Sequence, residues 1–417
     1  MIQAPKGTKD LLPQNSGAWQ AVEMSMRRCA ALAGFREIRT PVFEHTELFQ
    51  RGVGDSTDIV QKEMYTFVDK GKRSITLKPE GTAGVVRAVI ENKLYADPLP
   101  VKVYYLNAPI FRYENPQSGR LREHHQFGME CFGAKEPSAD AELITVLLGM
   151  LTELGLRNLT VHINSIGCPE CRPRYHELLK AYLKANYDEL CPTCKERFER
   201  NPLRVLDCKE EGCKKIAKDA PVIMNHLCDE CAEHFAGLKS LLTAQGTPFK
   251  IDTHIVRGLD YYTKTVFEII MQSEREGLAL CGGGRYDSLV TQLDGPALPG
   301  VGFGIGTERI MMELLSQGIE LPVESVCDVF VANLSADDRP QAFQVVSCLR
   351  DKRIKADMDH VGRSLKAQFK YAGKIGARHV VMVGGEEALR GNVKVRDMET
   401  REECETPVND IAAFFTK

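Results

Sequence analysis

The sequence lacks any apolar run long enough to cross a membrane. Its longest such stretch, LITVLLGML from Leu143, is far shorter than the roughly 20 residues that a spanning helix requires. The polar start MIQAPKGTKD also lacks the hydrophobic core of a signal peptide. We therefore expect a cytoplasmic protein that has no membrane partner.

The sequence also has little net charge, −3 at pH 7. This excludes a sequence-wide electrostatic attraction to nucleic acid, so a polyanion would have to meet a local basic surface. Arg363, Lys366, Lys370 and Lys374 are three or four residues apart and share one face of an expected helix. That face either is solvated or contacts nucleic acid, and the sequence leaves both readings open.

No internal repeat or low-complexity tract interrupts the 417 residues, a length that suits two or three domains. Residues 101–114 and 126–133 are β-rich and flank a polar loop, which predicts a long hairpin. From 170 to about 245 the chain is cysteine-rich, charged and helical, as in an insertion. From 326 to 417 strands alternate with helices, which indicates a small α/β domain after a first domain of residues 1–325.

The cysteines are unevenly spread, because eight of the fourteen fall between Cys168 and Cys231, in CPEC, CPTC, CKEEGC and CDEC. In a chain expected to be cytoplasmic, they are thiols or metal ligands rather than disulfides. The spacing suits tetrahedral Zn²⁺. Alternatively, reduced cysteines fill a small helical core as compact apolar groups. A structural Zn²⁺ stays open at this point, and no metal ligand is assigned.

Two familiar nucleotide motifs are missing: no segment has P-loop spacing, and GVGFGIG lacks the context of a dinucleotide fingerprint. Three arginines, however, lie at strand-associated turns, in IFRYE (Arg112), IVRGLD (Arg257) and GIGTERI (Arg309). The planar guanidinium binds phosphate oxygens through paired hydrogen bonds. Three such arginines favour a polyphosphate site over surface decoration.

Several polar groups occur where strand neighbours should bury them. Arg257, Tyr261 and Tyr262 come just before a segment in which apolar and polar residues alternate, as in a half-buried strand. Their position predicts either a surface turn or a pocket for a small anion. Glu80 in KPEGT and Glu130 in FGMECFG need partners, which are either structural ion pairs or a bound cation or donor.

Taken in order, seven stretches resemble the motifs of the histidyl-tRNA synthetase family, a class II aminoacyl-tRNA synthetase family. They are GTKDLLP, STDIVQKEMYTF, KPEGTAG, FRYENPQSGR with HQFGMECFG, IVRGLDYY, GGGRYDSLV and GFGIGTER. The resemblance covers essentially the whole chain. It implies an α+β fold: a class II antiparallel sheet with flanking helices, a helical insertion and a C-terminal α/β anticodon-binding domain.

The family makes histidyl-adenylate and pyrophosphate from L-histidine and ATP with Mg²⁺, and then transfers histidine to the 3′ end of tRNA(His). The resemblance thus implies a histidine–tRNA ligase with these partners. It also implies a homodimer with residues 35–45 at the interface.

The resemblance also implies roles for individual residues. Arg257 and Arg112 are the implied catalytic residues, on opposite sides of the α-phosphate. The implied histidine pocket consists of Glu80, Gly81, Thr82, Arg112, Gln126, Glu130, Arg257, Tyr261 and Tyr262. The implied ATP contacts are Arg112, Glu114, His124 and Arg309. Within the pocket, Glu80, Thr82 and Gln126 would meet the ammonium group, and Glu130 with Tyr262 the imidazole.

The chain departs from the family pattern at three positions. His124 stands where the family has a phenylalanine that stacks on adenine. Lys78 and Ser288 replace an arginine and a glycine.

Two other functions compete with this interpretation. One is the regulatory subunit of ATP phosphoribosyltransferase, a non-catalytic paralogue that typically lacks an anticodon domain and the arginine motifs. The other is a class II synthetase for another amino acid, which Glu130 and RGLDYY argue against.

Overall fold

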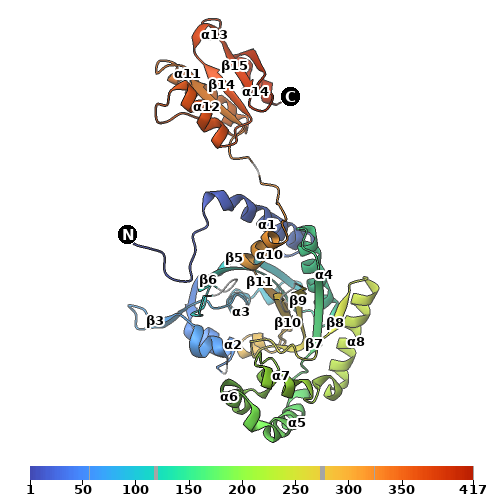
Figure 1. The fold of residues 1–417 in the computed structure, drawn as a ribbon. Coiled ribbons are helices and arrows are strands. Elements are labelled where there is room, and N and C mark those ends of the chain that lie inside the picture. Colours follow the sequence, from blue (N-terminus) through green and yellow to red (C-terminus); the bar gives the residue numbers. More distant parts are fainter. Residues whose placement is uncertain (56, 117–120, 273–277, 324, 417) are drawn as a thin grey trace. The chain divides into compact units, whose positions relative to one another are not determined.

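The computed structural model describes residues 1–55, 57–116, 121–272, 278–323 and 325–416. The chain divides into two compact units, Met1–Leu321 and Pro322–Lys417 (Figure 1). Residues 117–120 of the predicted loop lie outside the described part of the chain. Among the described residues, no helix combines the length and apolar character needed to span a membrane.

The first unit is built on a large sheet with an antiparallel centre and one parallel strand at each edge (Figure 1). Its spatial order is β1 (Arg36–Glu37), β5 (Val101–Phe111), β6 (Glu123–Phe132), β11 (Gly300–Gly306), β10 (Leu278–Arg285), β9 (Thr263–Met271), β7 (Leu159–Ser165) and β8 (Phe249–Ile251). β5 and β6 pair along their length, so the predicted hairpin is confirmed.

The two faces of this sheet differ because side chains alternate along each strand. One face packs Phe127, Met129 and Phe303 against four helices, in the largest apolar cluster. These helices are α1 (Pro13–Leu32), α4 (Pro137–Glu153), α8 (Asp229–Ala244) and α10 (Thr307–Ser316). The opposite face, called here the site face, carries Gln126 and Glu130 and is partly covered by α3 (Thr82–Glu91) and α9 (Leu289–Gln292).

A buried ion pair joins the large sheet to its helices. Arg285 and Asp140 are both completely buried and paired, and His234 of α8 lies 3.4 Å from the same carboxylate. Arg285 also donates to the carbonyl of Ala134 at 2.7 Å. Removing one partner of such a pair leaves an uncompensated buried charge. The arginine of GGGRYD therefore fixes α4 and α8 against the sheet.

A second, small sheet lies beside α3, in the order β2 (Phe43–His45), β4 (Ser74–Leu77) and β3 (Thr66–Val68). The intervening α2 (Thr46–Val53) packs Leu48 and Phe49 against Ala83 of α3. Residues 46–49 directly follow β2 but do not extend it. They are helical instead, because Phe49 and Val53 are four residues apart and both are fully buried.

The insertion is helical, and its elements follow β7 and precede β8 in the sequence (Figure 1). They are α5 (Cys171–Ala185), η3 (Tyr187–Glu189), α6 (Pro192–Arg200), η4 (Pro202–Val205), α7 (Glu211–Lys218), η5 (Ile223–His226) and α8. Its apolar core includes Tyr175, Leu179 and Leu183, which lie on one face of α5, together with Val256.

The second unit is a mixed sheet with helices on both faces. Its spatial order is β13 (Ala356–Met358), β12 (Val329–Asn333), β14 (His379–Val383), β15 (Asn392–Asp397) and β16 (Glu403–Pro407). Its helices are α11 (Arg339–Asp351), α12 (Leu365–Lys374), α13 (Gly385–Leu389) and α14 (Ile411–Phe415). α11 and α14 share one apolar cluster, and α12 packs into another. The sheet joins parallel strands β13, β12 and β14 to antiparallel β15 and β16.

Candidate active site

Glycines form the floor of the site face. This glycine floor consists of Gly128, Gly282, Gly302 and Gly304 on β6, β10 and β11. Gly304 lies opposite both Gly128 and Gly282, and Gly302 lies opposite Glu130. A Cβ at Gly302 would overlap the Glu130 carboxylate, and one at Gly282 would overlap the Arg257 guanidinium. Large polar side chains can therefore lie flat on the sheet because their neighbours have no side chain.

Glu130 is fully buried at the centre of this face. Its carboxylate accepts a hydrogen bond from Thr82 Oγ1 at 2.8 Å and another, shorter one from the Tyr286 hydroxyl. Burial raises the pKa of Glu130 to about 8, against the opposing effect of these two donors. The structure thus holds a carboxyl group whose pKa is raised by burial and that faces hydroxyl donors.

Glu80 lies at the start of α3, where it accepts hydrogen bonds from the backbone N–H groups of Thr82 (2.8 Å) and Ala83 (2.7 Å). It therefore satisfies donors that a helix start leaves unpaired. Burial raises the pKa of Glu80. Gly81 lies between these residues, and a Cβ there would overlap the Tyr105 ring. The Tyr105 hydroxyl in turn donates to Gln126 at 3.2 Å.

Three buried tyrosines form a wall beside Glu130. The ring centroids of Tyr261 and Tyr262 are 4.7 Å apart, and those of Tyr261 and Tyr286 are 5.6 Å apart. Burial raises the pKa of each phenol, and the negative charge of Glu130 adds to the effect. The hydroxyls are therefore neutral at pH 7 and available as donors.

Arg257 lies above Gly282 and forms an ion pair with Glu268 of β9. Its side chain is about one-fifth exposed. Its backbone carbonyl accepts a hydrogen bond from Arg204 of the insertion at 3.0 Å. A partly accessible, anchored cation thus borders the tyrosine wall.

The other two predicted arginines lie near His124. Arg112 donates to the carbonyl of Pro79 at 2.8 Å, and its guanidinium is 4.0 Å from Glu114. Arg309, at the start of α10, donates to the carbonyl of Ala279. Burial lowers the pKa of His124 to about 4, and the positive charges of Arg112 and Arg309 act in the same direction. His124 is thus a neutral ring between two cations.

The structure brings the predicted residues to one face, but it also adds three that the sequence reasoning did not name. Tyr286 donates to Glu130, Glu268 pairs with Arg257, and Tyr105 supports Gln126. Only Tyr286 had a local signal, since it follows Arg285 in the quoted motif GGGRYD. Glu268 and Tyr105 reach the site through strand pairing that no local pattern reveals.

Comparisons with known proteins agree with this geometry. The family model described as histidyl-tRNA synthetase matches residues 7–310, and an anticodon binding domain model matches residues 328–417. A histidine–tRNA ligase of Clostridium botulinum is 53% identical over 410 residues, 98% of each chain. One from Clostridium perfringens is 52% identical over 409 residues, 98% of this chain and 97% of the relative. The apo histidyl-tRNA synthetase of S. aureus is 36% identical, with a TM-score of 0.85 and complete coverage of both chains.

The chain belongs to the histidyl-tRNA synthetase family. The fold class expected from the sequence is confirmed by the solved relative. The expected function, that of an aminoacyl-tRNA ligase acting as a histidine–tRNA ligase, is also confirmed. The comparisons lend no support to the regulatory-subunit alternative, and the family match argues against a synthetase for another amino acid.

The buried carboxyl group of Glu130 predicts a pH-dependent stability difference. The folded pKa of about 8 exceeds the ordinary value of 4.5, so the folded protein binds more protons between these pH values and wild-type stability falls as pH rises. Glu130→Gln lacks this titration. Its melting temperature, relative to wild type, should therefore rise between pH 5 and pH 8 and then level off, as measured by calorimetry without substrates.

Glu142→Gln, which removes a partly exposed carboxylate from α4, controls for the loss of one acidic group. If the Glu130→Gln difference stayed constant from pH 5 to pH 8, Glu130 would not have a raised pKa.

Proposed function

We propose that the site face activates histidine by bringing its carboxylate to the α-phosphorus of ATP, which is taken up together with Mg²⁺. The carboxylate oxygen attacks the phosphorus, the bond to the β-phosphate oxygen breaks, and pyrophosphate leaves. Histidine's carboxylate is already ionised at pH 7, so this step needs no protein base. The observation that carries the proposal is the convergence of Arg257, Glu130 and the tyrosine wall over the glycine floor.

In this proposal Arg257 and Arg112 neutralise charge on the α-phosphate from two sides, and Arg309 holds the outer phosphates. Their contribution is alignment and charge stabilisation at a preorganised site. Arg257 suits this role because Glu268 pairs with its guanidinium and Gly282 leaves room for it, while part of the side chain stays accessible.

Glu130 would select histidine by accepting an imidazole N–H, with Tyr262 beside it. An apolar amino acid offers no such donor, so its binding would leave buried polar groups without partners. Support comes from the position of Glu130 among hydroxyl donors at the base of the site. Glu80, Thr82 and Gln126 would hold the ammonium group, with Gly81 leaving room for Tyr105. His124 and Glu114 would contact adenine.

Residues 1–325, interrupted at about 170–245, would thus form the catalytic domain, and 326–417 the anticodon-binding domain. The 3′ end of tRNA(His) would reach the catalytic domain to accept histidine, and the second domain would bind the anticodon region. α12 offers a basic surface in the second domain, because Lys366, Lys370 and Lys374 are exposed. Arg363 does not belong to it, since it precedes the helix, pairs with Asp359 at 2.7 Å and stacks on Tyr371.

Homodimer formation would use the small sheet and residues 35–45. Its surface bears four exposed apolar side chains, Val42, Phe43, Phe67 and Val68. Exposed apolar side chains of this kind would be covered by the partner subunit in a dimer.

Replacing Arg257 with alanine should slow ATP–pyrophosphate exchange by about 10² to 10³, the usual loss for one preorganised donor at developing charge. Exchange with and without histidine measures this. Arg157→Ala, at an exposed position of the same unit, should keep the wild-type rate. A folded Arg257→Ala protein with normal exchange would remove Arg257 from the mechanism.

Reversing the charge of Lys366 and Lys370 to glutamate should weaken tRNA binding and lower the slope of affinity against salt by about one for each phosphate that the protein no longer neutralises. Filter binding across a salt series measures both, and pyrophosphate exchange should not change. Lys352→Glu with Arg353→Glu makes the same charge change at exposed positions after α11. Equally weakened binding in both double variants would mean that α12 does not recognise tRNA specifically.

Replacing Phe43 and Phe67 with glutamate should convert the dimer to monomers, because two charges would be buried in the interface. Sedimentation velocity measures the mass of each species. Leu315→Glu changes an exposed apolar residue of α10 and should leave the dimer intact. A wild-type protein that sediments as a monomer would contradict the dimer.

A further inference from the structure

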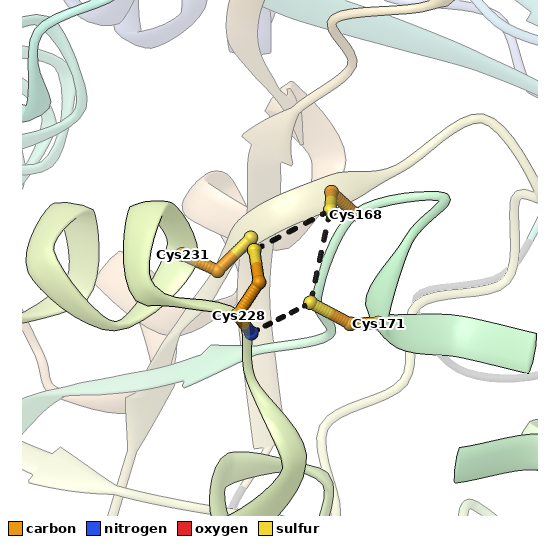
Figure 2. Close-up of side chains that lie close together, drawn as sticks. All are labelled: Cys168, Cys171, Cys228 and Cys231. Carbon is orange, nitrogen blue, oxygen red and sulfur yellow. Dashed lines mark hydrogen bonds between the residues drawn. The ribbon is translucent and has the colours of Figure 1, made fainter. Parts of the chain in front are cut away.

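The cysteines of the insertion gather into two groups of four. The first cluster is Cys168, Cys171, Cys228 and Cys231, and the second cluster is Cys191, Cys194, Cys208 and Cys213. Within each cluster all sulfur atoms lie within 4.8 Å of one another. The first cluster joins cysteines 60 residues apart in the sequence, and the second joins cysteines 17 residues apart. Figure 2 shows the sulfurs of the first cluster turned toward one another.

The spacing of the sulfurs fits four ligands around one ion. Thiolates bound to Zn²⁺ at about 2.3 Å in a tetrahedron lie about 3.8 Å apart. In the first cluster, Cys168 Sγ is 3.7 Å from Cys171 Sγ and 3.8 Å from Cys228 Sγ. In the second, Cys191 Sγ is 3.9 Å from Cys208 Sγ. These distances are far longer than a disulfide bond of about 2.05 Å, and all fourteen cysteines are free.

The cysteines lie at helix starts, and this position favours a metal site over an apolar core of reduced thiols. Each C-x₂-C pair lies at the N-terminus of a helix, with Cys171 first in α5, Cys191 just before α6 and Cys228 just before α8. Backbone N–H groups and the helix dipole favour thiolates there. The sulfur of Cys171 accepts the N–H of Cys228 at 3.1 Å. Thiols that merely fill a core gain nothing from these positions.

We propose that each cluster binds one Zn²⁺ through four thiolates, so that the insertion carries two structural zinc ions per chain. Four sulfur ligands in a tetrahedron select zinc or iron–sulfur chemistry. Zinc is favoured because each thiolate of a four-iron cluster binds a different iron, which places the sulfurs farther apart than ligands of a single ion.

The first cluster also holds one side of the segment 257–264. Gly167, next to Cys168, accepts the backbone N–H of Lys264 at 2.8 Å, and Ile166 donates to the carbonyl of Lys264 at 2.8 Å. Arg172, next to Cys171, donates to the carbonyl of Tyr262. The first zinc would therefore hold the start of α5 against the end of the tyrosine wall.

The second cluster holds the other side of the segment 257–264. The turn η4 lies between Cys194 and Cys208, and its Arg204 donates to the carbonyl of Arg257 at 3.0 Å. Asn201, just before this turn, donates to Asp260 at 2.8 Å. No sequence pattern connects the insertion with histidine activation, but these hydrogen bonds provide a direct connection.

Metal analysis of untagged protein, purified without chelators, tests the proposal. Elemental analysis should find two zinc ions per chain. Titration with a mercurial thiol reagent should release both to a colorimetric zinc dye. Replacement by Co²⁺ should produce the absorption bands of tetrahedral cobalt thiolate. Protein without stoichiometric zinc, with all fourteen thiols titratable on denaturation, or with iron instead, would overturn the proposal.

Serine variants assign the ions to the clusters. Cys168→Ser with Cys228→Ser should leave about one zinc ion per chain, and so should Cys194→Ser with Cys208→Ser. Cys348→Ser with Cys404→Ser, in the second unit, should retain two. A double variant that keeps both ions would remove its cluster from the proposal, and wild-type metal content decides the matter if a variant fails to fold.

A second measurement, which rests on the proposed function, tests the link to the site. In the folded variant Cys168→Ser with Cys228→Ser the KM for histidine should rise more than the KM for ATP, because Tyr262, a proposed imidazole contact, loses support from Arg172. Zinc content is measured independently of activity, so a failure of the proposed residue roles would leave the metal result intact. If a variant that has lost zinc kept the wild-type KM values for histidine and ATP, the zinc ions would serve only the folding of the insertion.

Discussion

A carboxyl group buried at the centre of an antiparallel sheet is the constraint on which the site depends. Glu130 has no access to water, so its carboxyl group needs hydrogen-bond partners within the protein. Thr82 and Tyr286 supply them from 48 and 156 residues away. The start of α3 must therefore bring Thr82 to Glu130, and the end of β10 must bring Tyr286 to it. Gly302 must lack a side chain, because its Cβ would occupy the space of the carboxylate.

The segment 257–262, unlike Glu130, is not held by a sheet. It carries three proposed substrate contacts without helical or strand structure of its own. Irregular backbone must find hydrogen-bond partners outside the segment if its side chains are to stay in place. Arg204 and Arg172 of the insertion provide partners for the carbonyls of Arg257 and Tyr262. A small domain tied together by cysteine clusters can thus contribute to the geometry of the sheet without contacting a substrate.

The parts of the fold that local patterns encode could be predicted from the sequence. The β-rich segments on both sides of a polar loop predicted the hairpin of β5 and β6, and the concentration of cysteines marked the insertion. Buried polar residues such as Glu130 marked the site face, and family resemblance suggested their roles. The partners Tyr286, Glu268 and Tyr105 could not be derived in this way, because each depends on strand order. The boundary at Thr46 has no clear local signal, because the strand-like FEH runs directly into the short helix α2.

The histidine at position 124 shows how strand geometry can make an unusual substitution tolerable. His124, Gln126 and Glu130 are separated by even numbers along a continuous strand, so they share the site face, whereas His125 points the other way. His125 is hydrogen-bonded to Glu308, which raises its pKa. His124 instead lies near Arg112 and Arg309, and burial with these two charges lowers its pKa to about 4. It is therefore an uncharged, flat aromatic ring at pH 7. A ring of that kind can stack on adenine, the role proposed for this position, without adding a third positive charge beside the two arginines.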